Sequence, residues 1–240
     1  MQKIKLIDVS KSFKSKKALS NINIEFISNR INGLLGPNGS GKTTLFNIIA
    51  GFLSPDSGKI FLDENNLNHM SLSLRTKLGI SYLPQEASIF RGLNVEDNIK
   101  SILEIAETDK QIIESNLDQL LTEFDISHLR RTPSLALSGG ERRRVEIARC
   151  LAGKPNYILL DEPFAGIDPI ALGEIKELVS HLKDKGVGVL ITDHNVRETM
   201  GLIDRAVLIH EGSVLIEGKP EDIIKNDDVR RVYLGERFSI

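Results

Sequence analysis

The chain has little of what secreted or membrane-spanning proteins require. Its 240 residues include one cysteine, Cys150, so no internal disulfide can form. That cysteine lies in an apolar helical stretch, which favours a buried hydrophobic side chain over a nucleophile. No apolar run approaches the ~18–20 residues that cross a bilayer, and the N-terminus carries no apolar signal-peptide block. These absences predict a cytosolic protein that is held at a membrane only by a partner.

An excess of charge of one sign is also lacking. The chain has 31 Lys and Arg residues against 33 Asp and Glu, which gives a net charge of −2 and no overall basic surface for nucleic acid. Residues 142–144 are three consecutive arginines, but apolar residues follow them at helical spacing. We therefore interpret them as the solvated face of a helix. The length suits one large domain, or one domain with an inserted subdomain.

One glycine-rich segment has a specific pattern. Residues 36–43, GPNGSGKT, fit G-x-x-x-x-G-K-[ST] and lie between an apolar run and a helical pattern. Small residues let backbone N–H groups converge on phosphate oxygens, and the helix N-terminus points at the same anion. We expect Lys42 to bind the β- and γ-phosphates and the Thr43 hydroxyl to bind Mg²⁺. The nucleotide-binding residues predicted here are Gly36, Pro37, Asn38, Gly39, Ser40, Gly41, Lys42, Thr43 and Thr44.

Strand and helix patterns alternate along the rest of the chain, which predicts an α/β fold. The first 35 residues alternate like short strands, residues 63–68 are expected to form a polar loop, and a helix is expected over 170–183. Residues 86–150 differ, because their apolar residues recur at helical spacing, with Asn94 as a plausible N-cap. This segment is predicted to be a helical insert. In the tail, residues 219–222 are interpreted as a capping box before a short helix.

A second chemical site follows a short apolar strand at residues 157–160. Four apolar residues and then Asp161 form the pattern whose carboxylate helps hold Mg²⁺ in phosphate-loop proteins. Glu162 follows directly, and an acid there can polarise a water for attack on the γ-phosphate. The alternative is an exposed strand end without chemistry. The phosphate loop elsewhere in the chain favours the catalytic interpretation.

These motifs together resemble a known family. The order GPNGSGKTT, Gln85, LSGGE, ILLDEP, AGIDP and His194 is similar to the nucleotide-binding domain of ABC ATPases, over essentially the whole chain. The resemblance implies one α/β domain with a P-loop NTPase (RecA-like) core, an N-terminal antiparallel β subdomain and an inserted α-helical subdomain. The expected limits are 1–85 and 151–216 for the core with the β subdomain, 86–150 for the helical subdomain and 217–240 for the tail.

The resemblance also implies roles for individual residues. Gln85 would touch Mg²⁺ and the attacking water, and His194 would contact the γ-phosphate. Phe13 would stack on adenine, although core packing is an alternative, and Asp168 would link two ATP sites. The remaining implied residues form the signature, which binds the ATP of the opposite subunit in a homodimer: Ser138, Gly139, Gly140 and Glu141.

Longer strings, such as GISYLPQEASIFRGL and LLDEPFAGIDPI, resemble a narrower group, the lipopolysaccharide export ATPases. That group implies a homodimer beneath the membrane proteins LptF and LptG, with LptC associated. Phe90 and Arg91 would then receive the coupling helices of the membrane subunits, whereas the alternative packs Phe90 inside the helical insert. Two other functions remain open: a branched-chain amino-acid transporter ATPase, or a soluble ABC protein acting on DNA or ribosomes.

Overall fold

The computed structural model describes residues 2–14, 16–167 and 169–235. The N-terminal part is an antiparallel sheet with the strand order β2-β1-β4-β5. Its strands are β1 (Lys3–Phe13), β2 (Lys16–Ile27), β4 (Ser57–Leu62) and β5 (Asn65–Asn66). Alternate side chains of β1, such as Ile4 and Leu6, are almost fully buried, as expected for a sheet with one covered face. The short β5 lies inside the segment that was expected to be a loop.

The central sheet has the strand order β10-β9-β3-β8-β7-β6. Its strands are β3 (Ile31–Leu35), β6 (Ile80–Leu83), β7 (Tyr157–Asp161), β8 (Gly188–Thr192), β9 (Arg205–His210) and β10 (Ser213–Gly218). The pairs β3–β8, β3–β9, β7–β8 and β6–β7 are parallel, and β10 runs antiparallel to β9. Strands β3 and β8 are buried at every residue, because elements cover both faces of the sheet. The α/β prediction is confirmed.

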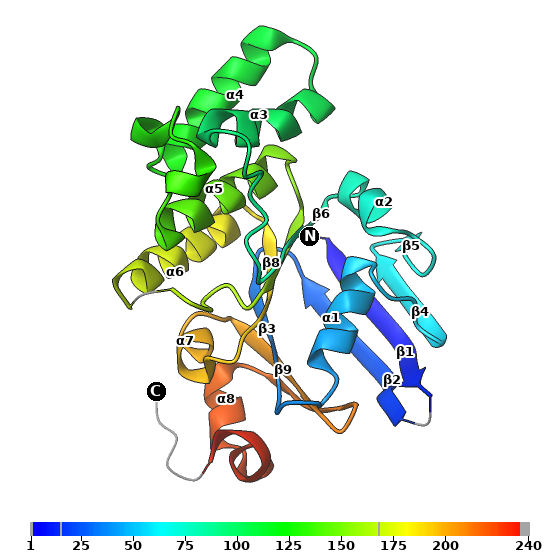
Figure 1. The fold of residues 1–240 in the computed structure, drawn as a ribbon. Helices are drawn as coiled ribbons and strands as arrows, with labels where there is room; N and C mark the ends of the chain where they lie inside the picture. Colours follow the sequence, from blue (N-terminus) through cyan, green and yellow to red (C-terminus); the bar gives the residue numbers. More distant parts are fainter. Residues whose placement is uncertain (1, 15, 168, 236–240) are drawn as a thin grey trace.

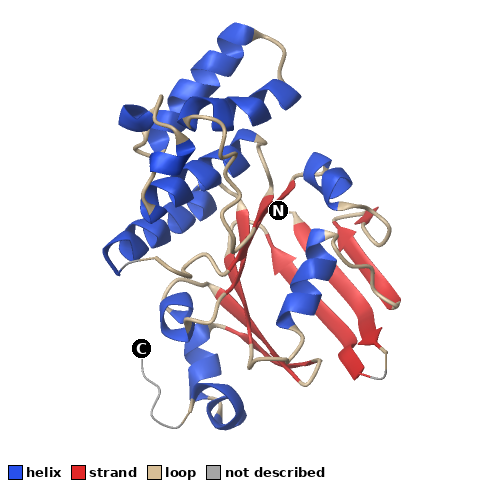
Figure 2. Cartoon of the chain, in the orientation of Figure 1, coloured by secondary structure: helices blue, strands red, loops and turns tan. Residues whose placement is uncertain are grey.

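Two hydrophobic clusters lie on the two faces of the central sheet, and Figures 1 and 2 show the layers of helices and strands around it. Helix α1 (Lys42–Ala50) packs between the two sheets, where its Phe46 joins Leu34 and Leu190 from the central sheet. On the opposite face of that sheet, Ile191 belongs to a larger cluster, to which the four longest described helices contribute side chains. These are α3 (Val95–Ala106), α4 (Lys110–Glu123), α5 (Gly139–Ala152) and α6 (Pro169–Asp184). In the segment predicted to be helical, the Asn94 side chain caps α3 by accepting from the Asp97 N–H.

Helix α2 (Leu72–Lys77) was not expected from the sequence, and it supplies a buried cation. Arg75 is 1% exposed and donates to the carbonyls of Ile48 and Ile49 at 2.6 Å, at the C-terminal end of α1. It also donates to the carbonyls of Leu67 and Met70. Burial lowers the pKa of Arg75 to about 10. A charged group therefore satisfies carbonyls that end the helix of the phosphate loop.

Two expectations were wrong. Arg143 is 6% exposed and not part of a solvated face, because the loop after β6 packs over it. Lys219, the N-cap of α8 (Pro220–Lys225), makes no side-chain capping bond, since an ammonium group has no acceptor for the helix N–H groups. The chain continues through α9 (Asp227–Val229) to a π-helical turn over Arg230–Leu234. No helix among the described residues has the length and apolarity needed to cross a membrane.

Candidate nucleotide site

The topology of the central sheet brings four loops to one edge. Strands β3, β8, β7 and β6 are neighbours in that order and run parallel, so their carboxyl ends meet there. The four loops carry the phosphate loop, His194, the Asp161–Glu162 pair and Gln85, respectively. Ligands of open α/β sheets bind outside the carboxyl ends of the strands. Residues that lie up to about 160 positions apart in the chain thus share one edge.

The phosphate loop is tightly folded around its own lysine. Lys42 is 7% exposed, and its Nζ donates to the carbonyls of Gly36 and Pro37 at 2.6 and 2.9 Å. Burial lowers the pKa of Lys42, while the nearby Glu162 carboxylate acts in the opposite direction. A Cβ at Gly36, where φ is +145°, would come within 2.1 Å of the Ile209 carbonyl oxygen. Only glycine therefore fits where the loop crosses β9.

The Ser40 hydroxyl of this loop is free to bind a ligand. Ser40 is 4% exposed, and no described residue forms a hydrogen bond with its Oγ. A buried polar atom without a partner costs free energy, about 1–3 kcal/mol. The Gly212 N–H holds the loop in place by donating to the Ser40 carbonyl at 2.9 Å. Phosphate oxygens offer the kind of acceptor that such a hydroxyl lacks.

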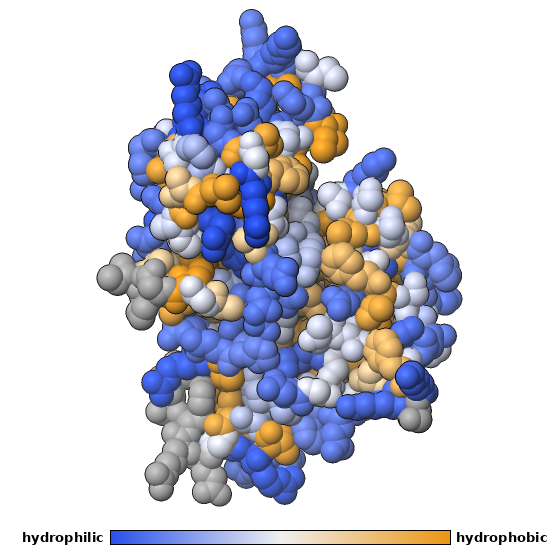
Figure 3. Space-filling model, viewed as in Figure 1, coloured by the Kyte–Doolittle hydropathy of each residue, from blue (hydrophilic) through white to orange (hydrophobic). Residues whose placement is uncertain are grey.

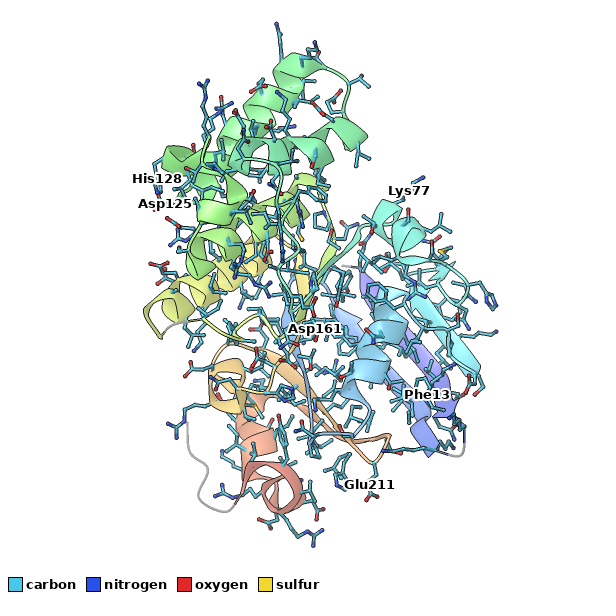
Figure 4. All side chains as sticks on the ribbon, in the orientation of Figure 1. Phe13, Lys77, Asp125, His128, Asp161 and Glu211 are labelled. Carbon is cyan, nitrogen blue, oxygen red and sulfur yellow. The ribbon has the colours of Figure 1, made fainter. Side chains whose placement is uncertain are left out.

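The two acidic residues at the end of β7 have different partners. The Tyr82 hydroxyl donates to Asp161 at 3.3 Å, and burial raises the pKa of the Asp161 carboxyl. Figure 4 shows Asp161 near the centre of the molecule. Glu162 instead pairs with His194, with 2.7 Å between Oε1 and Nε2. Its backbone has φ +45°, an uncommon conformation for a non-glycine residue that is found at functional sites.

Two residues at this edge were not identified from the sequence. Asp193 is 4% exposed and accepts from the N–H groups of Phe164 and Asn195, so it joins the loops after β7 and β8. Tyr233, from the C-terminal turn, lines an open cavity of about 490 Å³ with Pro37, Asn38 and His194. Burial raises the pKa of Tyr233 to about 12. The position of Tyr233 beside the phosphate loop depends on the fold, so no local sequence pattern indicates it.

The signature segment forms the exposed N-terminus of α5. The Ser138 hydroxyl accepts from the Glu141 N–H at 3.3 Å, and the Glu141 carboxylate accepts from the Ser138 N–H at 2.8 Å. This reciprocal capping box fixes the helix end. Gly139, the first residue of the helix, is exposed, and a Cβ there would meet nothing within 4 Å. Gly140 lies beside Ala171.

The other predicted residues are distributed over the molecule. Gln85 is exposed and lines a cleft of about 40 Å³ with Gly139 and Glu162. Phe13 is 46% exposed at the end of the β1–β2 hairpin, with Lys11 Nζ 5.8 Å from its ring centre (Figure 4). An exposed ring is available for stacking, which core packing would not allow. Asp168 lies outside the described residues.

Comparison with known proteins agrees with this arrangement. The family model described as "ABC transporter" matches residues 19–165. A "Probable ABC transporter ATP-binding protein" of Azorhizobium caulinodans is 57% identical, over 97% of this chain and 83% of that protein. The chain belongs to the ABC transporter ATP-binding family. It is therefore an ABC ATPase, and its activity is ATP hydrolysis.

Further relatives and structures are similar over nearly the whole length. "Lipopolysaccharide export system ATP-binding protein LptB" of Haemophilus influenzae is 49% identical, and LptB of Escherichia coli K12 is 47% identical, each over 97% of both chains. The structure titled the ADP conformation of MJ1267, an ATP-binding cassette of an ABC transporter, has a TM-score of 0.88. It is 28% identical and covers 98% of this chain and 100% of its own.

A second feature of this ABC ATPase is the exposed pair Phe90 and Arg91, in the segment that follows Gln85. Phe90 is 47% exposed, so its ring is not packed inside the helical insert, and Arg149 lies 4.7 Å from the ring centre. Phe90 lines a groove of about 210 Å³ with Leu72 and Thr76 from α2 and with Ile102 from α3. Arg91 is exposed next to it. Figure 3 shows hydrophobic side chains as separate patches among hydrophilic ones on the face displayed.

Proposed function

We propose that this ABC ATPase is the ATP-hydrolysing subunit of a transporter that extracts lipopolysaccharide from the inner membrane for export to the outer membrane. The single observation that supports lipopolysaccharide as the transported molecule is the similarity to LptB, with 47–49% identity over 97% of both chains. The geometry of the sheet edge supports the hydrolytic step. On this proposal the protein lies on the cytoplasmic face of the inner membrane and works as a homodimer bound to LptF and LptG, with LptC associated.

In the proposed mechanism, Glu162 takes a proton from the water that attacks the γ-phosphate. Its contact with His194 places the carboxylate at the edge between β7 and β8, and His194 turns to the γ-phosphate when ATP binds. Lys42 exchanges its two loop carbonyls for the β- and γ-phosphate oxygens. The loop N–H groups and Lys42 then stabilise the charge of the transferred phosphoryl group. Phe13 stacks on the adenine ring.

The side chains at the edge fit Mg²⁺. The donor set proposed for it is the Thr43 hydroxyl, the Gln85 amide oxygen and the Asp161 carboxylate, and these are the hard oxygen ligands that Mg²⁺ prefers. No three His, Cys, Asp or Glu side chains of the described residues are grouped as a metal site. That agrees with an ion held by one carboxylate together with substrate phosphates. When bound, Mg²⁺ neutralises charge on the β- and γ-phosphates.

The second half of the site is proposed to come from another copy of the chain. Gly139 and Gly140 form the first turn of α5, between the two residues of the capping box, and the positive end of this helix suits an anion. One related structure, 26% identical with a TM-score of 0.77, is titled the dimeric structure of a post-hydrolysis state of MJ0796 bound to ADP and Pi. In a homodimer, this segment would close on the ATP held by the partner's phosphate loop, with Asp168 between the two sites.

Docking of the membrane subunits is proposed at Phe90 and Arg91. The half-exposed Phe90 ring lies 4.7 Å from the Arg149 guanidinium and lines a groove, and an aromatic ring of this kind can anchor a partner helix. The test is affinity purification from detergent-solubilised membranes of cells that express the tagged chain. Recovery of LptF and LptG with the wild type, and their loss with Phe90→Ala and Arg91→Ala together, supports the proposal. Matched controls are Phe52→Ala, also half-exposed, and Arg131→Ala, also exposed.

Two outcomes would contradict the proposed cargo. Copurification with the membrane subunits of a branched-chain amino-acid transporter would assign the ATPase to a different ABC transporter that uses the same catalytic residues. ATPase activity stimulated by DNA or ribosomes, without membrane partners, would indicate a soluble ABC protein. The net charge of −2 does not favour the second.

A further inference from the structure

One face of helix α5 holds the loop that carries Gln85. Three charged residues, Arg143, Glu146 and Arg149, follow one another at three-residue intervals and so share a face of the helix. Arg143 and Glu146 are buried, at 6% and 2% exposed. A carboxylate with so little exposure needs strong partners, because its desolvation is costly. All three of these side chains bind residues between Pro84 and Phe90.

Glu146 forms the central contacts of this face. Its Oε1 accepts from the N–H groups of Ser88 and Ile89, at 2.7 and 3.2 Å. Its Oε2 accepts from Arg143 Nη1 at 3.3 Å, and the same Nη1 donates to the Pro84 carbonyl at 3.1 Å. Both carboxylate oxygens are therefore occupied. Glu146 is thus no second general base, although the cleft beside it is also lined by Glu162.

The contacts bracket Gln85 on both sides. Arg143 binds the residue immediately before it, and Glu146 binds the backbone three and four residues after it. Arg149 adds two bonds at 2.8 Å, to the carbonyl and the hydroxyl of Ser88. The exposed Gln85 side chain thus stands on a segment whose two ends are fixed to α5. The N-terminus of that helix is the signature segment.

We infer that Glu146 is a positioning residue for ATP hydrolysis, which holds the Ser88–Ile89 backbone on α5 and thereby sets where Gln85 lies relative to Glu162. Any shift of the signature end of α5 then moves Gln85 with it, and docking at Phe90 acts on the same segment. The inference rests on the role proposed above for Gln85. A misplacement of about 1 Å in an active site can lower a rate by as much as ~10²-fold.

The test compares Glu146→Leu and Glu146→Gln with Gln85→Ala in the full-length protein, with ATP and Mg²⁺. Glu146→Leu removes every acceptor and is expected to lower kcat about 10-fold, with the KM for ATP nearly unchanged, because the phosphate loop is untouched. Glu146→Gln keeps an acceptor for the two N–H groups and is expected to retain most of kcat. In the Gln85→Ala background, Glu146→Leu is expected to lower kcat no further.

Folding is controlled separately. Ile147→Val alters a buried residue of the same helix, 1% exposed, and is expected to leave kcat unchanged. Amide hydrogen exchange gives a readout without turnover: the Ser88 and Ile89 amides exchange faster in Glu146→Leu and stay protected in Glu146→Gln. All rates are measured well below each variant's melting temperature. If Glu146→Leu does not fold, Glu146→Asp, whose carboxylate is one methylene shorter, replaces it in both assays, with the same expected loss.

The outcomes separate the two proposals. A normal kcat in Glu146→Leu beside a reduced kcat in Gln85→Ala overturns this inference alone, as do effects of the two substitutions that multiply. A normal kcat in Gln85→Ala overturns both, because Gln85 would then have no catalytic position to keep.

Discussion

The two halves of the proposed ATP site are built in opposite ways. On the phosphate-loop side, Lys42 is 7% exposed, and glycine is required at position 36, where a Cβ would come within 2.1 Å of a backbone oxygen. On the signature side, Gly139 is exposed, and a Cβ there would meet nothing within 4 Å. The first half is enclosed by its own chain, whereas the second half is an open helix end.

This difference shows which constraints are internal. Near Gly36, a substitution harms the chain's own packing, so folding and function change together. At Gly139 the chain itself imposes no steric limit, so a functional need for glycine must come from something that approaches from outside. This agrees with the proposal that a partner's nucleotide completes the signature half.

The largest effect is expected when the proposed base is removed. Glu162→Gln keeps the size of the side chain but cannot take a proton, so turnover is expected to fall roughly 10²–10⁴-fold. ATP binding should persist, because the phosphate loop is intact, and an ATP-bound dimer should accumulate. Phosphate release and size-exclusion chromatography with ATP measure the two effects. Glu177→Gln, an exposed acid on α6, serves as the control. Near-normal turnover of Glu162→Gln with its partners present would refute the assignment.

The internal support of the phosphate-loop half can be tested at Arg75. Arg75→Met leaves four backbone carbonyls without their donor, and the free energy of unfolding is expected to fall by about 3 kcal/mol or more. For a chain of this size, that corresponds to a melting temperature lower by roughly 6–12 °C. Lys77→Met, on the same helix and exposed, should change the melting temperature little. Equal melting of both variants would mean that α1 does not depend on Arg75.

The open half is tested at Gly139. Gly139→Ala should leave stability unchanged or slightly higher, since alanine favours helices and space is free. Turnover is nevertheless expected to fall about 10-fold, equivalent to ~1.4 kcal/mol in the barrier, because the added methyl group would meet the partner's nucleotide. Gly173→Ala, also free of steric contact, is the matched control on α6. Full activity of Gly139→Ala would argue against close approach of a second nucleotide.

The sequence predicted the residues of the phosphate-loop half better than the buried residues that hold them in place. The phosphate loop, the Asp161–Glu162 pair and the strands before them are contiguous patterns, so their chemistry could be inferred locally. Arg75 and Arg143 could not be assigned, because charged residues are usually exposed and only tertiary packing shows what buries these two. Tyr233 and Asp193 were missed for the same reason. Their partners lie in loops that meet only when the sheet forms.

The smallest effect is expected at the contact between α4 and the end of α6. Glu123, at the end of α4, accepts from Lys185 Nζ at 2.6 Å and contacts His181 Nε2 at 2.9 Å, so it ties α4 to the end of α6. Burial alone would raise the pKa of Glu123, but the hydrogen bonds and charges of Lys185 and His181 outweigh it and lower the pKa below its usual value. The side chain is 12% exposed. Glu123→Gln is expected to cost about 1 kcal/mol at neutral pH.

The pH dependence follows from the sign of that shift. Because the folded-state pKa lies below the unfolded value near 4.5, the ionised Glu123 stabilises the fold fully above that pH. The contribution is lost as the pH falls through the folded pKa. Urea unfolding of wild type and Glu123→Gln should therefore differ at pH 7, and the difference should become smaller as the pH falls below 4.5, whereas Glu104→Gln, an exposed acid on α3, should match wild type throughout. A difference that persists unchanged at pH 4 would mean that the α4–α6 link depends on packing and not on the charge of Glu123.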